Sequence, residues 1–337
     1  RILKILLGTA LLALAAFPFV GTDYYLQMVT RMMILAIFAM SLDLLQGITG
    51  LVSLGHAAYF GVAGYVLAFL SPADAGASWL TSLPLAVLAS ALLALTIGFF
   101  VVRTQGIYFI MVTMAFAQMV YFLFFDNKAL GGSDGLYVNV RPAALGLDFE
   151  NKLVMYFFTL ACLVLTYAFL RRLLWSPFGR TLNGIRLNEH RTQALGYASF
   201  SYKLTAFTLA GALAGLAGYL WAAQSGYVNP ELMGFHMSAH AIMMVILGGM
   251  GNVAGALIGA FGFEFLGRGP QHARGQRVQR LPRLWQRDPH VGLARVGFPH
   301  RLDHRAAQNP AGRGRHGLAA LCAIGAGHAL PRARPAR

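Results

Sequence analysis

Residues 79–102 read W-L-T-S-L-P-L-A-V-L-A-S-A-L-L-A-L-T-I-G-F-F-V-V, and this stretch decides the fold class. It carries no charged side chain. A helix needs about 20 mostly apolar residues to cross the hydrocarbon core of a bilayer, so the stretch is long enough to do so. Backbone groups in that core can be satisfied only within the chain, which favours a helix. The stretch predicts a transmembrane helix.

Comparable apolar runs fill the first 267 residues. Of the 337 residues, 57% are hydrophobic and 12% are charged, which is more apolar surface than the core of a soluble domain needs. We expect about eight spans, at residues 2–20, 24–47, 51–70, 79–102, 106–125, 152–170, 203–224 and 237–266. The predicted fold class is all-α, a polytopic membrane helical bundle.

The net charge of +15 is distributed unevenly. Residues 1–267 contain 13 Lys and Arg against 10 Asp and Glu, whereas residues 268–337 contain 14 Arg and only two Asp. We therefore expect a transmembrane domain at 1–267 and an Arg/Ala/Gly/Pro-rich tail at 268–337, either disordered or the aberrant product of a frameshift. Since the basic charge belongs to the tail, it does not indicate nucleic acid as a partner.

Loop charges predict how the chain is oriented in the membrane. Lys and Arg accumulate in short cytoplasmic loops. The loop at 171–203 carries six basic residues, whereas the loop at 126–152 carries three basic and four acidic ones. The loop at 171–203 is therefore expected in the cytoplasm, and counting crossings back from it places the N-terminus there too.

Within that loop, residues 176–197 read S-P-F-G-R-T-L-N-G-I-R-L-N-E-H-R-T-Q-A-L-G-Y. Apolar residues at near-helical spacing predict one short amphipathic helix that begins at Pro177 and ends at Gly196. Such a helix outside the bilayer needs a partner for its apolar face. It is interpreted as a docking helix for a soluble subunit, with a solvated basic loop as the alternative.

Glycine and polar residues interrupt two of the predicted spans, G-L-V-S-L-G-H-A-A-Y-F-G at 50–61 and I-L-G-G-M-G-N at 246–252. Broken helices of this kind surround transport sites. The candidate residues of a substrate path are Ser53, Gly55, His56, Gly248, Gly249 and Asn252. For His56 the alternative is a packed, hydrogen-bonded side chain.

Other residues in the spans predict contacts between helices. Arg31 and Asp43 lie over three turns apart in one predicted helix, so each is expected to find its partner on another helix. The G-x-x-x-G spacing of Gly211 and Gly215, and the double one over 251–259, predict close helix–helix seams.

The sequence contains no Gly-Lys dipeptide and hence no phosphate-binding G-x-x-x-x-G-K-[ST] loop, so ATP hydrolysis is expected only on a separate subunit. The H-E-x-x-H motif is also missing. The chain is not expected to be an enzyme.

Four stretches, in this order, resemble the branched-chain amino-acid ABC transporter permease family, in particular its LivM-type subunit. They are 47–61, 103–118 with G-G-S-D-G at 131–135, 176–207 and 244–260. The resemblance implies a bacterial inner-membrane importer of leucine, isoleucine or valine with two different permease subunits, two ATP-binding subunits, a soluble substrate-binding protein and no cofactor in this chain. It also implies that 176–197 is the segment coupled to the ATPase, with Arg180, Arg186, Glu189, Arg191 and Gly196 as its residues.

The resemblance covers residues 1–266, and the further apolar helix of the family is not recognisable after Leu266. Two alternatives remain for the function. One is an ABC permease for urea or short amides. The other is an ATP-independent secondary transporter in which Asp43, Arg31 or His56 relays ions.

Overall fold

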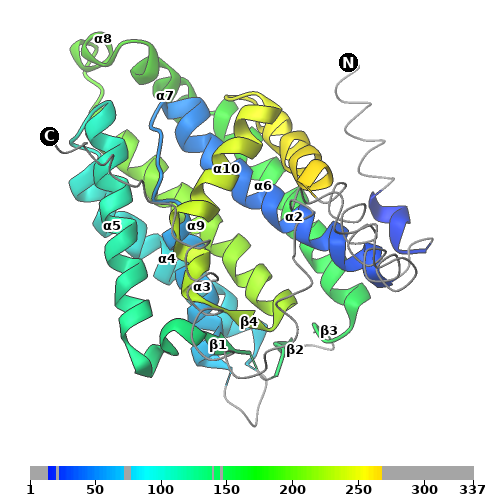
Figure 1. The fold of residues 1–337 in the computed structure, drawn as a ribbon. Coiled ribbons are helices and arrows are strands. Elements are labelled where there is room, and N and C mark those ends of the chain that lie inside the picture. The colour runs from blue at the N-terminus through cyan, green and yellow to red at the C-terminus, as the bar shows by residue number, and fades with distance from the viewer. Residues whose placement is uncertain (1–13, 20–22, 72–76, 139, 145–146, 268–337) are drawn as a thin grey trace, which may run out of the picture. The chain divides into compact units, whose positions relative to one another are not determined.

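The computed structural model describes residues 14–19, 23–71, 77–138, 140–144 and 147–267, which form a bundle of helices (Figure 1). The predicted all-α class is confirmed. The expectations for the tail at 268–337 and for the first part of the run at 2–20 lie outside the described residues.

The helices differ in length. The long ones are α2 (Asp23–Asp43), α4 (Trp79–Val101), α5 (Ile107–Asp126), α6 (Lys152–Trp175) and α9 (Ser199–Ser225). The shorter ones are α3 (Ala57–Leu70), α7 (Pro177–Leu187), α8 (Glu189–Ala194), α10 (Phe235–Gly248) and a helix at Val253–Gly267. Single turns are η1 (Phe17–Phe19), the π-helical η2 (Leu44–Thr49), η3 (Lys128–Leu130), η4 (Gly132–Asp134) and η5 (Pro230–Met233).

Four two-residue strands form two antiparallel pairs. They are β1 (Leu136–Tyr137) with β4 (Tyr227–Val228), and β2 (Ala143–Ala144) with β3 (Leu147–Asp148). The strands lie at one end of the bundle, and α7 and α8 lie at the opposite end (Figure 1). We call the latter pair of helices, residues 177–194, the α7–α8 segment.

Five helices of the described chain are long and apolar enough to cross a membrane. They are Asp23–Thr49, Trp79–Val101, Ile107–Asp126, Lys152–Trp175 and Ser199–Ser225. They confirm the spans predicted at 24–47, 79–102, 106–125, 152–170 and 203–224. A bent pair of helices would make a sixth span, so the expected count of eight is not confirmed.

The run at 51–70 is not one continuous helix. Gly50 ends the π-helical turn with a φ of 76°, and the chain then continues without helix until α3 begins at Ala57. The backbone N–H of Ala57 donates to Ser238 Oγ on α10 at 3.0 Å. With 14 residues, α3 is shorter than a membrane-crossing helix. The apolar composition of 51–70 predicted a full span. Composition does not show that Gly50, just before the run, has a positive φ and ends the preceding helix.

The run at 237–266 is a broken pair of helices, which is either one bent span or a re-entrant loop. Its two helices, α10 and Val253–Gly267, are bent by 115° at the glycine-rich break that the sequence indicated. Gly249 and Gly251 adopt φ angles of 92° and 85°, which side chains with a Cβ rarely take. The chain therefore turns back on itself here.

The seam at Gly211 and Gly215 is confirmed, and the one predicted over 251–259 is confirmed at Gly255 and Gly259 but not at Gly251, which lies in the break. A Cβ at Gly211 would lie 2.3 Å from Ala94 Cβ on α4. A Cβ at Gly255 would lie 2.3 Å from the carbonyl oxygen of Gly248, so the second seam joins the two arms of the bent pair. Real Cβ contacts are longer, so these backbones approach to distances that only glycine permits.

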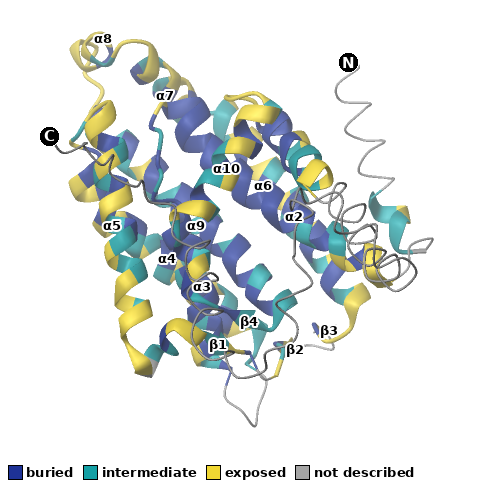
Figure 2. Cartoon of the chain, viewed as in Figure 1, coloured by how far each residue is buried: buried dark blue, intermediate teal, exposed yellow. Residues whose placement is uncertain are grey.

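Residues at the centre of the bundle are more buried than those at its edge. Helix α2 is buried along most of its length, whereas α5 stays largely exposed at the side of the bundle (Figure 2). Phe109, Thr113 and Ala117 are the buried residues of α5. The opposite side of α5 is not covered by the described part of this chain.

Candidate functional site

The α7–α8 segment is two helices, so the prediction of one helix over 176–197 was wrong. Asn188 takes an extended conformation (φ −158°, ψ 103°) and its Oδ1 accepts a hydrogen bond from the backbone N–H of Arg191 at 3.0 Å. Asn188 thus ends α7 and caps α8. The predicted ends hold, because Pro177 is the first residue of α7 and Gly196, with a φ of 90°, follows α8.

An ion pair ties α8 to the bundle. Glu189 Oε2 lies 2.6 Å from Lys203 Nζ on α9 and accepts a hydrogen bond from Gln105 Nε2 at 3.3 Å. Burial opposes ionisation of Glu189, but hydrogen bonds from Lys203 and Ser199 and the charge of Lys203 hold its pKa below the ordinary value. Glu189 is therefore a charged anchor at physiological pH.

Arg180, Arg191 and Gly196 lie exposed on the outer side of the segment, where a soluble protein could bind. Arg186 differs from them. Although much of its side chain is exposed, its Nη1 donates a hydrogen bond to the carbonyl oxygen of Gly47 at the end of the α2–η2 helix. The segment is therefore in direct contact with a transmembrane helix.

The interrupted stretch at 50–61 is packed inside the bundle. His56 is fully buried; its Nε2 lies 2.9 Å from Ser41 Oγ, and its ring stacks on Phe38. Ser53 is also fully buried, and a Cβ at Gly55 would lie 2.3 Å from the carbonyl oxygen of Thr113. His56 is therefore packed and hydrogen-bonded in this structure, and its place in a substrate path stays a prediction.

The interrupted stretch at 246–252 makes a different contact. The backbone N–H of Gly251 donates to Asp43 Oδ1 at 2.8 Å, and Asn252 Oδ1 accepts from the N–H of Ala254 at the start of the next helix. Asp43 therefore finds its partner on another segment, as expected. Arg31 does so too, because its guanidinium lies 5.8 Å from the Trp221 ring centroid on α9.

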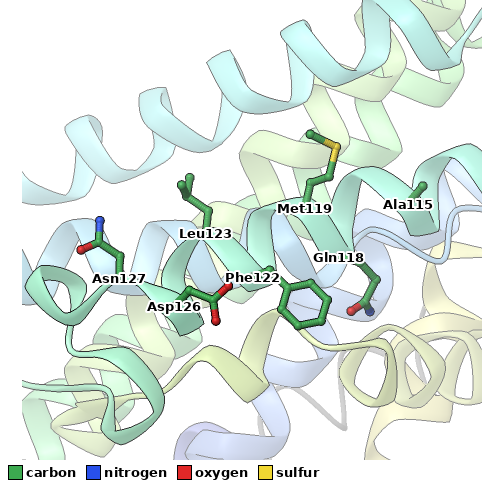
Figure 3. Close-up of a pocket in the computed structure, with 7 residues that line it drawn as sticks. All are labelled: Ala115, Gln118, Met119, Phe122, Leu123, Asp126 and Asn127. Atoms are coloured by element: carbon green, nitrogen blue, oxygen red, sulfur yellow. The ribbon is translucent and has the colours of Figure 1, made fainter.

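The exposed side of α5 carries a shallow and widely open depression, which we call the groove (Figure 3). Its lining residues are Ala115, Gln118, Met119, Phe122, Leu123, Asp126 and Asn127. Gln118, Phe122 and Asp126 recur every four residues and point to the same side (Figure 3). The groove thus combines apolar side chains with a carboxamide at mid-helix and a carboxylate at the end of α5.

None of the six predicted path residues lines this groove. The sequence signal that could have found it is the pair Gln118 and Asp126, eight residues apart on one side of an otherwise apolar helix. The neighbouring helix α4 offers the contrast, because the large residues that it exposes, such as Leu88 and Leu92, are apolar and suit lipid. A glutamine and an aspartate are costly against hydrocarbon.

Comparison with known proteins agrees with this architecture. Residues 24–271 match the family model described as branched-chain amino acid transport system / permease component. The chain belongs to this family. The match covers most of the membrane domain and both interrupted stretches.

Individual relatives of this permease family are similar at moderate identity. The chain is 32% identical over 281 residues to the high-affinity branched-chain amino acid transport system permease protein LivM of Salmonella typhimurium, and 31% identical to that of Escherichia coli. Each alignment covers 76% of this chain and 66% of the relative. The autoinducer 2 import system permease protein LsrC of Salmonella typhimurium is 30% identical over 198 residues, 53% of each chain. No solved structure matches the chain significantly.

Proposed function

We propose that this chain is the multi-pass permease subunit of an ABC importer for leucine, isoleucine and valine. Its partners would be a second, different permease subunit, two ATP-binding subunits and a soluble substrate-binding protein. The importer would lie in the bacterial cytoplasmic membrane, with the N-terminus and the α7–α8 segment in the cytoplasm. The LivM-type relatives support this substrate class, and the charge of the 171–203 loop supports the orientation.

The observation that carries the proposal is the groove on α5. A branched-chain amino acid brings an α-ammonium group, an α-carboxylate and a branched apolar side chain. Asp126 would attract the ammonium group at the outer end of the groove, and the Gln118 amide, two turns further along α5, would donate to the carboxylate as the amino acid moves inward. Met119, Phe122 and Leu123 would contact the apolar part. Urea and short amides carry neither the ammonium group nor the branched side chain, so the side chains of the groove would bind them less tightly.

The two ends of the groove fit an importer. α5 begins beside the α7–α8 segment, because Gln105 just before it donates to Glu189. Asp126 lies at the far end of α5, near the short strands. With the α7–α8 segment in the cytoplasm, Asp126 faces the outside, where an arriving amino acid would meet it first. The second permease subunit would close the open side of the groove.

We expect Asp126→Asn to raise the KM for leucine uptake about threefold to fivefold, which corresponds to the roughly 1 kcal/mol that an exposed ion pair contributes. Uptake is measured in proteoliposomes that contain the assembled transporter. Glu150→Gln is the matched control, since Glu150 is an exposed carboxylate outside the groove and should leave KM unchanged. An unchanged KM for Asp126→Asn would show that Asp126 does not bind the ammonium group of leucine. Preferential uptake of urea would favour the alternative of a short-amide permease.

A further inference from the structure

Three parts of the chain that are distant in sequence meet at Gly47. The carbonyl oxygen of Gly47, in η2, accepts the hydrogen bond from Arg186 of α7. One helical turn earlier, Asp43 accepts the hydrogen bond from the N–H of Gly251, in the break between α10 and the helix Val253–Gly267. The end of α2 is thus bonded to the α7–α8 segment on one side and to the bent helix pair on the other.

The backbones at this meeting point are closely packed. A Cβ at Gly47 would lie 2.1 Å from Asp43 Oδ1 and 2.3 Å from the Gly251 nitrogen. A Cβ at Gly251 would lie 3.0 Å from the Gly47 carbonyl oxygen and 3.6 Å from Arg186 Nη1. The two glycine backbones touch with no flexible side chain between them. Close-packed contacts of this kind pass on small displacements because they cannot absorb them.

The bond to Gly251 is also a strong one. Asp43 is fully buried, and a hydrogen bond in a low-dielectric interior is stronger than the same bond in water. Arg186 supplies the opposite charge, since its guanidinium acts electrostatically on Asp43. Gly249 and Gly251 both have positive φ, so the break held by Asp43 is a turn that glycine allows to pivot.

We propose that Asp43, Gly47, Arg186 and Gly251 form a joint that carries movement of the α7–α8 segment to the bent helix pair. Arg186 and Asp43 are its positioning residues. The inference rests on the proposed function, which makes the α7–α8 segment the docking site of the ATP-binding subunits. Because Arg186 is exposed on its outer side and bonded to Gly47 on its inner side, it links the docking surface to the membrane helices.

The test uses the full chain in the reconstituted transporter. Hydrogen exchange of the backbone amides at 247–253 is followed with and without a non-hydrolysable ATP analogue. Leucine transported per ATP hydrolysed is measured on the same samples. The variants are Arg186→Gln and Asp43→Asn, and the control is Asn183→Ala, an exposed position one turn earlier on α7.

In the unmodified transporter the nucleotide should change exchange at 247–253. In both joint variants the ATP-binding subunits should still co-purify and hydrolyse ATP, but exchange at 247–253 should no longer respond. Transport per ATP should fall by at least about fivefold, the lower end of typical coupling between sites. Asn183→Ala should behave as the unmodified protein does.

The joint would be disproved if exchange at 247–253 in the variants still responds to nucleotide and transport per ATP is unchanged. Loss of co-purification in Arg186→Gln would also disprove it, because Arg186 would then be a docking residue. If Arg186→Gln does not fold, the isosteric Asp43→Asn decides the question alone. Failure of the unmodified chain to recruit ATP-binding subunits would instead defeat the proposed function itself, which distinguishes the two failures.

Discussion

Replacing Ala115 by tryptophan is expected to reduce leucine uptake by about tenfold or more, because the indole would fill the groove on α5 and pores select by the space that they offer. Ala115 is exposed, so the larger side chain meets no packed neighbour within the described part of this chain. Expression and thermal stability of the isolated chain should therefore stay unchanged. Uptake is measured in proteoliposomes with the complete transporter.

Leu95→Trp on α4 is the matched control for the groove. Leu95 is 42% exposed and lies among apolar residues that suit lipid, so the same indole there should leave uptake unchanged. Normal uptake by Ala115→Trp would show that the groove is not the path. Loss of the second permease subunit from the Ala115→Trp complex would show that this side of α5 is a subunit contact instead.

Removing the anchor of α8 should have the largest effect on stability. Glu189→Ala leaves Lys203, whose side chain is 8% exposed, without its counter-charge. Breaking a buried ion pair costs about 3–5 kcal/mol, and because Glu189 is 23% exposed we expect about 2 kcal/mol. Thermal unfolding of the purified chain should show this as a lowered Tm, and the double variant Glu189→Ala/Lys203→Met should recover most of the loss.

The same pair predicts a pH dependence. The pKa of Glu189 is lowered from its ordinary value of 4.5, so the folded state favours the charged form. The stabilisation is fully present above pH 4.5 and is lost as the pH falls through the lower, folded-state pKa. Glu189→Ala should lack this component of acid destabilisation. An equal Tm for the two proteins at neutral pH would contradict the anchoring role.

The sequence predicted the long helices and the glycine contacts well, for a physical reason. Spans such as α4 are apolar over their whole length because the bilayer requires it, and the spacing of Gly211 and Gly215 serves a backbone contact that no other residue permits. The break at 246–252 was visible for the same reason, since two of its glycines have positive φ.

The groove could not be predicted in the same way. Lipid and a path for an apolar amino acid both favour apolar side chains, so only Gln118 and Asp126 distinguish the groove side of α5, and hydropathy averages them out. Ser53 and His56 stand out in the sequence as polar residues in a predicted span, and both are fully buried inside the bundle. The split at Asn188 was hidden because apolar residues recur at helical spacing on both sides of it.

The most direct test of the account is leucine uptake by proteoliposomes that contain the assembled transporter and its binding protein, with ATP present or absent on the side of the α7–α8 segment. Leucine should accumulate only with ATP, and a non-hydrolysable analogue should not replace it. Equal leucine uptake without ATP, driven by an ion gradient alone, would contradict the account and make the chain a secondary transporter.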